Sequence, residues 1–315
     1  MRVAFCDSCG GPLEAPWTEI AVVCRHCGVH NLPNSGPVPS STPSDARTRL
    51  NLGGRTVVLE GLIGQGDSAM VYRARWVRRL GELLVVKVAR TREDLDLLRA
   101  EFAALQRLCS PGDPAVNHFI TRLPVPVCEG AVTTRGERRW VTVYRWQSGM
   151  QRDLTTVRQH HPDGIDGHAL VWVAKRTLET LAYAHRRGVA HGAVLPPHLV
   201  IHPREHAAML VGWTLAGRLG RALPGQVTAW KGAYTHSMRT PALDLNQLCW
   251  TILWAARANS ARQTGSLPRP LAEVFVRGAT AKADDAWALR AEVDAAAAKA
   301  YGPPSYHPLP LPRRQ

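Results

Sequence analysis

The stretch that most constrains the fold is residues 191–200, which read His-Gly-Ala-Val-Leu-Pro-Pro-His-Leu-Val. It directly follows an apolar helix pattern that ends with residues 181–190. Upstream come, in order, a segment with two glycines, a lysine inside a β-branched run and a helix pattern that carries a glutamate. Downstream, a second apolar helix pattern opens with Asp244. Each feature is a weak signal alone, but their fixed order makes the combination specific.

In this context residues 191–200 resemble the catalytic loop of protein kinases, whose signature is H-R-D-L-x-x-x-N. His191 matches the first position of that signature. The resemblance places Ala193 where the family has its catalytic-base aspartate, and Leu195 where a lysine steadies the transferred phosphate. His198 stands at the position of the metal-binding asparagine. The loop therefore predicts a kinase fold from which the phosphotransfer residues have been removed.

The segment that begins at Gly64 resembles the glycine-rich loop G-x-G-x-x-G-x-V, which covers the phosphates of ATP in that family. Gly64, Gly66 and Val71 match the pattern, and Ala69 replaces the third glycine. Lys87 lies in the run Leu-Leu-Val-Val-Lys-Val-Ala. This run resembles the family strand whose lysine contacts the α- and β-phosphates. The alternative interpretation of this lysine is an exposed position on an edge strand.

A helix pattern over residues 93–108 places Leu98 and Leu105 on one apolar face. Glu101 within this pattern would project toward Lys87, as in the Lys–Glu ion pair of the family. The resemblance thus implies that the smaller lobe keeps its nucleotide-facing residues. These are Gly64, Gly66, Val71, Lys87 and Glu101.

The family motif D-F-G corresponds here to Gly212, Trp213 and Thr214. The resemblance therefore implies that the magnesium-binding aspartate is absent. No aspartate occurs between Asp166 and Asp244 that could replace it nearby. General-base and metal assistance each contribute several orders of magnitude to phosphoryl transfer. With both removed, we expect negligible phosphotransferase activity.

Two residues are expected to have structural roles that the family retains. The resemblance implies that His191 supports the backbone of the loop and that Asp244 caps the loop amides from the helix it opens. Residues 215–243 correspond to the activation segment and are basic. Because Gly192 replaces the loop arginine, phosphorylation would not order this segment in the usual way.

The N-terminal residues 1–32 contain two C-x-x-C pairs, which predict a zinc ribbon. Four thiolates fill a tetrahedral structural zinc site and leave no open position for catalysis. A module this small needs the metal in order to fold. A redox pair is the weaker alternative, because a thioredoxin-like site would have one pair only. The predicted zinc ligands are Cys6, Cys9, Cys24 and Cys27.

We therefore expect an α+β, two-lobed protein-kinase-like fold preceded by a small zinc ribbon. Residues 33–51 are Pro/Ser-rich and predict a flexible linker, and the proline-rich residues 301–315 predict a disordered tail. The kinase-like domain is expected over residues 52–300. Its smaller lobe would cover about residues 52–146 and its larger lobe about residues 147–300.

The net charge of +14 permits acidic proteins, nucleic acids or anionic membranes as partners. Nucleic-acid binding by the ribbon and the basic surface is an alternative that we do not favour. No apolar run reaches about 18 residues, so no membrane span or membrane partner is predicted. The sequence shows no signal-peptide pattern, and its cysteines do not form a disulfide framework. We therefore expect a cytoplasmic protein.

The overall interpretation is a pseudokinase that resembles bacterial-type Ser/Thr kinases and regulates or scaffolds protein partners. The ribbon would serve as a tethered interaction module with structural zinc. Any ATP that binds is expected to bind weakly and independently of magnesium. The enzyme alternative is an atypical Ser/Thr kinase or another nucleotide-dependent transferase.

Overall fold

The computed structural model describes residues 48–134, 136–150, 152–281 and 283–311, together with four short strands nearer the N-terminus. These strands form two antiparallel pairs, β1 with β2 and β3 with β4. The predicted zinc ligands and most of the predicted linker lie outside the described residues, so the zinc site and the flexible linker stay predictions. The strands are β1 (Ala4–Phe5), β2 (Pro12–Leu13), β3 (Val22–Val23) and β4 (His30–Asn31).

The smaller lobe is built on a six-stranded antiparallel sheet in the order β5-β6-β7-β8-β10-β9. Its β-branched and aromatic runs favour extended backbone. The first hairpin turns at Gly53 and Gly54, whose φ angles of +54° and +78° glycine adopts readily. Val57, Leu84 and Val141 are buried at the centre of its core. The strands are β5 (Arg49–Leu52), β6 (Arg55–Gln65), β7 (Ala69–Trp76), β8 (Arg79–Ala89), β9 (Pro126–Thr134) and β10 (Glu137–Arg145).

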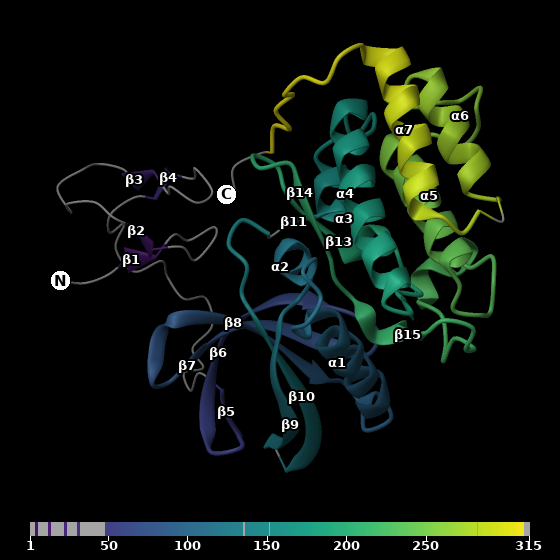
Figure 1. Cartoon of the computed structure of the whole chain (residues 1–315). Coiled ribbons are helices and arrows are strands. Elements are labelled where there is room, and N and C mark those ends of the chain that lie inside the picture. The colour runs from purple at the N-terminus through teal and green to yellow at the C-terminus, as the bar shows by residue number, and fades with distance from the viewer. Residues whose placement is uncertain are drawn as a thin grey trace.

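Helix α1 (Leu95–Cys109) packs beside this sheet, against β9 and β10 (Figure 1). Leu98 and Leu105 are fully buried on one helix face, which confirms the helical period read from the sequence. Before the helix, the Asp94 carboxylate accepts hydrogen bonds from the amide and hydroxyl of Thr91, each 2.8 Å long. These bonds fix how the chain enters the helix.

The larger lobe consists mainly of helices, and four long ones, α4 to α7, run side by side in Figure 1. Helix α5 is apolar around most of its circumference and is buried along most of its length, as expected for a central helix. No helix in the described part of the chain is long and apolar enough to cross a membrane. The helices are α2 (Val116–Phe119), α3 (Leu154–Gln159), α4 (Gly167–Arg186), α5 (Pro241–Ala256), α6 (Arg269–Gly278) and α7 (Ala286–Tyr301).

Two small sheets hold the loop that contains residues 191–198. One sheet pairs the strand before the loop with a later strand, and the other contains the strand that begins directly after the loop. Both ends of the loop are therefore fixed by backbone hydrogen bonds. The strands are β12 (Val189–Ala190) with β15 (Gly217–Arg218), and β11 (Arg152–Asp153), β13 (Leu199–His202) and β14 (Ala207–Leu210).

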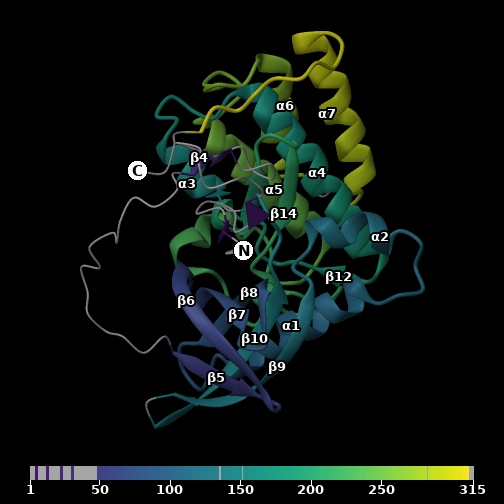
Figure 2. The ribbon, with the colours of Figure 1, turned by 90° about the vertical axis from the view of Figure 1, so that its left-hand side faces the viewer.

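Figure 2 shows strands β5 to β10 grouped on one side of the molecule and helices α4 to α7 on the other. The chain passes between the two groups after β10 ends at Arg145. The two-lobed α+β architecture expected from the sequence is thus present.

The C-terminal segment differs from the expected disordered tail. Helix α7 extends to Tyr301, and the ring of this residue stacks on His168 with centroids 3.8 Å apart. His307 stacks on the same imidazole at 3.8 Å, and Leu309 is only 6% exposed. The prediction is wrong for residues 301–311, because rings and one leucine spaced between the prolines bind this segment to the larger lobe.

Candidate functional site

The lysine and glutamate predicted to form an ion pair lie together at the centre of the smaller lobe. Lys87 Nζ, on β8, donates to both carboxylate oxygens of Glu101 on α1, at 2.6 and 2.8 Å. Glu101 is fully buried, and the Lys87 side chain is 13% exposed. Glu101 Oε1 also accepts a hydrogen bond of 3.0 Å from the backbone amide of Trp213. The pair therefore connects sheet, helix and larger lobe.

The two glycines of the predicted phosphate-covering turn lie at the end of β6 and just beyond it. Gly64 pairs with Val71 across the hairpin, and the Gly66 amide donates to Ala69 O at 2.9 Å. A Cβ atom at Gly64 would lie 3.6 Å from Val71 Cβ, which is an ordinary contact. The fold thus does not itself require these glycines, whereas close approach of a ligand to the backbone would.

Tyr144 on β10 lies behind the Lys87–Glu101 pair and is almost fully buried. Its ring centroid is 5.9 Å from Lys87 Nζ and 6.1 Å from the ring of Phe102. Burial, reinforced by the nearby Glu101 carboxylate, raises the pKa of the Tyr144 phenol well above its ordinary value. It is therefore a packing residue.

Asp244, at the start of α5, organises the backbone of the loop. Its fully buried carboxylate accepts hydrogen bonds from the amides of His191 and Gly192, at 2.8 and 2.7 Å. His185 Nε2 lies 2.8 Å from the same carboxylate. The structure therefore places Asp244 in contact with the loop, as its expected structural role requires.

His191 is fully buried and supports the loop through both ring nitrogens. Nδ1 accepts from the Ala193 amide at 3.1 Å, so the ring proton lies on Nε2, which is 3.0 Å from Val211 O. The ring edge also packs on Trp213, with centroids 4.4 Å apart. Burial lowers the pKa of His191 to about 3 despite the opposing effect of Asp244. The imidazole is therefore neutral, and it hydrogen-bonds to the backbone of Ala193 and Val211.

The two positions that would carry the base and the phosphate-binding lysine lie inside an apolar cluster. Ala193 and Leu195 are both fully buried. Leu215 and Ala233, from the segment after the loop, are buried with them. These two positions therefore carry no polar side chain and are packed against apolar neighbours. Partly buried residues around it are Leu97, Leu223, Val227, Trp230, Tyr234 and Trp250.

His198 fills the space next to Gly212. Gly212 has a φ of +76°, and a Cβ atom there would lie 2.4 Å from His198 Cδ2. His198 Nδ1 is 2.7 Å from the carbonyl oxygen of Ala193, so this nitrogen carries the proton. Burial lowers the pKa of His198, which keeps the imidazole neutral. An aspartate at position 212 would need both a strained backbone and displacement of this ring.

A similar restriction applies at Gly192, the position of the family arginine. Its φ is +78°, and a Cβ atom would lie 2.8 Å from Leu223 Cδ2 and 3.0 Å from Leu215 O. Among the described residues, no three His, Cys, Asp or Glu side chains are grouped so that they could hold a metal ion.

The segment after Gly212 folds back over the loop and touches the smaller lobe. The amide of Thr228, at the start of the 3-10 turn Thr228–Ala233, donates to Asp67 Oδ2 at 3.1 Å. Sequence reasoning missed this contact, and the only signal for it was an aspartate within the glycine-rich turn. It connects the two lobes across the front of the site.

Trp230 in this turn packs edge-on against Trp250 and Trp254, with ring centroids 5.5 and 5.4 Å apart. Trp250 and Trp254 lie four residues apart in α5. The structure shows them on one face but only partly buried, where they hold the turn. Arg239 also fixes this segment, since its guanidinium donates to the carbonyl oxygens of Leu215 and Ala222.

No protein-family model and no curated protein sequence matches the chain. Several solved structures do. Vaccinia related kinase 3 superposes with a TM-score of 0.65 at 16% identity, covering 87% of this chain and 97% of its own. The BubR1 kinase domain gives a TM-score of 0.59 at 15% identity, covering 81% and 84%. A rhoptry kinase from Toxoplasma gondii gives 0.53 at 21% identity, covering 79% and 84%. These likenesses establish a protein-kinase-like fold.

Proposed function

We propose that this chain is a catalytically inactive kinase-like protein that regulates or scaffolds other proteins. The observation that supports this most directly is the buried apolar cluster around Ala193 and Leu195, at the positions of the base and the phosphate-binding lysine. Phosphoryl transfer depends on positioning and on electrostatic stabilisation by magnesium. At the corresponding positions this chain offers neither a carboxylate nor an open space.

The replaced residues also fit one another. His198 occupies the space that a side chain at Gly212 would need, and Leu223 does the same at Gly192. A single reverse substitution would therefore clash with its surroundings instead of rebuilding a working site. This mutual packing favours a loop maintained for structure.

The smaller lobe supports a narrower proposal about nucleotide. The smaller lobe keeps the residue types that face the phosphates of ATP in kinases, at Gly64, Gly66, Val71, Lys87 and Glu101, but both oxygens of Glu101 already bind Lys87. An incoming ATP would rely on Lys87 and backbone amides for charge neutralisation. With no carboxylate at position 212, magnesium would add little, so nucleotide binding would be weak and independent of the metal.

The test of inactivity is a transfer assay with radiolabelled ATP, in magnesium and in manganese, with the chain itself and generic proteins as acceptors. An authentic protein kinase serves as the positive control. We expect no incorporation above background. Label that is incorporated by the wild type and lost in Lys87→Ala would overturn the proposal, because that dependence would mean transfer at this site.

The proposed zinc ribbon at Cys6, Cys9, Cys24 and Cys27 would serve as a tethered protein-interaction module of this cytoplasmic scaffold. What supports it is the C-x-x-C spacing. Metal analysis of purified full-length protein should find one zinc per chain, lost in Cys6→Ser or Cys24→Ser. Cys249→Ser is the control and should leave the zinc content unchanged. Zinc retained in both ribbon variants would contradict the ligand assignment.

A further inference from the structure

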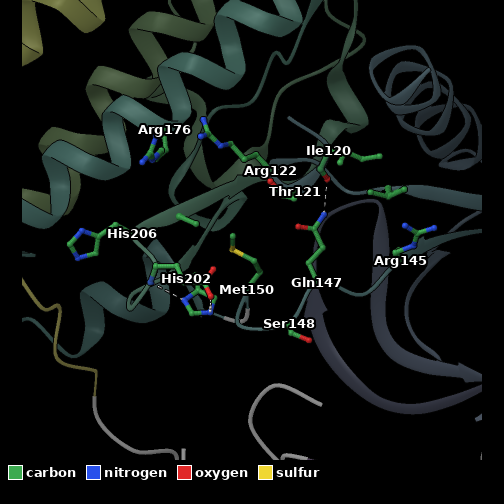
Figure 3. Close-up of a pocket in the computed structure, with 13 residues that line it drawn as sticks. Ile120, Thr121, Arg122, Arg145, Gln147, Ser148, Met150, Arg176, His202 and His206 are labelled. Atoms are coloured by element: carbon green, nitrogen blue, oxygen red, sulfur yellow. Dashed lines mark hydrogen bonds and ion pairs between the residues drawn. The ribbon is translucent and has the colours of Figure 1, made fainter. Parts of the chain in front are cut away.

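A hollow lies beside the segment that joins the two lobes, and its lining residues are distinct from the Lys87–Glu101 pair and the loop. Its volume is about 510 Å³, which is within the range of ligand-binding pockets. Figure 3 shows Arg145 and Gln147 on one side of it and His202 and His206 on the other. We call this hollow the rear pocket. It is marked by Arg122, Arg145, Ser148, Arg176, His202 and His206.

The wall formed by α4 and the segment before β9 carries excess positive charge. Arg122 and Arg176 both bind the carboxylate of Glu179, which also accepts a hydrogen bond of 3.0 Å from Arg290. Hydrogen bonds and charge from Arg122 and Arg176 outweigh burial and lower the pKa of Glu179, so its carboxylate is ionised. The single negative charge of Glu179 is thus shared by three guanidinium groups. Arg290 has a second partner in Asp294, whereas Arg122 and Arg176 face the pocket.

Arg145 adds a cation on the opposite side of the pocket. Its side chain is exposed at the end of β10 and has no hydrogen-bond or ionic partner among the described residues. An unpaired guanidinium at the rim of a hollow can bind a carboxylate through two parallel hydrogen bonds.

His202 provides a further donor and is held by close packing. Its side chain is 5% exposed, and a Cβ atom at Gly149 would lie 1.9 Å from its ring. His202 Nδ1 accepts from the Glu205 amide at 3.3 Å, so the proton lies on Nε2. Nε2 is 3.8 Å from Glu205 Oε1, which is beyond hydrogen-bond distance. Among the described residues, this buried donor therefore has no acceptor within hydrogen-bond distance.

The remaining lining includes apolar side chains, which we call the apolar strip. Ile120, Val125, Met150 and Ala207 contribute it. Glu205, whose side chain is 70% exposed, places one negative charge at the rim. A nucleic-acid strand would bring repeated phosphates against Glu205 and would gain little from the apolar strip. The mixture fits a chain with carboxylates on either side of an apolar side chain.

We propose that the rear pocket binds an acidic peptide segment of a partner protein, with carboxylates against Arg145 and the Arg122–Arg176 wall and an apolar side chain against Met150. The inference rests on the proposed scaffolding function, for which it specifies the chemistry of the partner. Complementary charge across such a contact determines partner choice and association rate.

The experiment uses the full-length protein and fluorescence anisotropy of a short labelled peptide in which glutamates alternate with leucines. The matching peptide with glutamine in place of glutamate tests whether charge is needed. Arg145→Glu and Ser148→Glu place negative charge at exposed lining positions, so both variants should fold normally. Arg138→Glu is the matched control, since it makes the same change on the same strand outside the pocket.

We expect the glutamate peptide to bind and the glutamine peptide to fail. Arg145→Glu and Ser148→Glu should each weaken binding by about tenfold or more, because like charges brought together at an interface cost several kcal/mol. Arg138→Glu should stay within about twofold of the wild type, since exposed charges beyond about 10 Å are largely screened. Free citrate in excess should compete only weakly, because it cannot use the apolar strip.

An equal loss of peptide affinity in Arg138→Glu and Arg145→Glu would overturn the proposal, because it would indicate general attraction to a basic surface. Full displacement by citrate at low concentration would overturn it in favour of a small-anion site. Absence of peptide binding would also overturn it. None of these results bears on phosphate transfer, which the radiolabel assay measures separately.

Discussion

At the scale of single residues, the close contact between His198 and Gly212 explains why the loop does not accommodate the family residues at these positions. The imidazole lies where a side chain at 212 would begin, and the left-handed backbone of Gly212 excludes most alternatives. The two residues therefore constrain each other. A reverse substitution at one of them is expected to be destabilising while the other remains.

Gly212→Ala should be destabilising for two separable reasons. The left-handed φ costs roughly 1–2 kcal/mol, and the clash with His198 adds about 1–3 kcal/mol. Gly220→Ala is the control, because Gly220 has a φ of +77° but no atom within 4 Å of the added Cβ. Urea unfolding should show the larger loss for Gly212→Ala. In a His198→Ala background, the additional loss of unfolding free energy caused by Gly212→Ala should be smaller. An unchanged additional loss would refute the steric explanation.

His191 should make stability depend on acid. Burial lowers its pKa from 6.5 to about 3 in the folded protein, so the unfolded chain binds a proton more readily. The free energy of unfolding should therefore fall as the pH drops from about 6.5 toward 3, by about 1.4 kcal/mol per pH unit at most. Asp244 opposes this effect, whereas His198 and Lys87 add to it.

His191→Gln tests this assignment, since an amide can donate to Val211 O and accept from the Ala193 amide without titrating. Its unfolding free energy, measured against pH with urea, should decline less steeply than that of the wild type between pH 6.5 and 4. Parallel curves would mean that other groups cause the acid dependence.

At the scale of elements, the contact between the glycine-rich turn and the 3-10 turn Thr228–Ala233 connects the lobes. Asp67 provides it through a single exposed hydrogen bond to the Thr228 amide. Trp230, packed against α5, holds the same turn from the other side. The turn is thus anchored in both lobes.

Asp67→Ala should loosen that turn without unfolding the domain. One exposed hydrogen bond contributes about 0.5–1.5 kcal/mol, which corresponds to roughly two- to tenfold faster amide exchange in residues 226–234. Asp163→Ala, an exposed aspartate in the larger lobe, controls for the loss of one charge. Equal exchange in wild type and Asp67→Ala, measured by mass spectrometry, would show that the Asp67–Thr228 hydrogen bond does not hold the turn.

The order of motifs predicts the lobes, the Lys87–Glu101 pair and the contact of Asp244 with the loop, because each depends on local pattern and fixed spacing. The sequence could not predict the filling of the Gly212 position by His198. That contact depends on a left-handed backbone and on tertiary packing. The packed tail was missed for a similar reason. Its stacked rings gain energy only against the larger lobe, whereas local composition indicates disorder.

At the scale of the whole molecule, the lobes are held together before any ligand is present. Lys87–Glu101 connects β8 to α1, and the Trp213 amide joins the same carboxylate from the larger lobe. A ligand stabilises a fold only in proportion to its preference for that state. ATP should therefore act, where it binds, as a structural ligand of an arrangement that already exists.

The final prediction concerns that ligand. A thermal-shift titration with ATP should give a small shift or none, and the shift should be of equal size in EDTA and in magnesium. A hundredfold excess over the dissociation constant would stabilise the fold by about 2.7 kcal/mol. Lys87→Gln lowers the starting melting temperature through loss of its ion pair, so each variant is compared with its own ligand-free value. Loss of the shift in Lys87→Gln would assign ATP binding to the Lys87 site. A shift that needs magnesium would mean that other groups hold the metal, and His198, the side chain beside Gly212, would be the first to substitute.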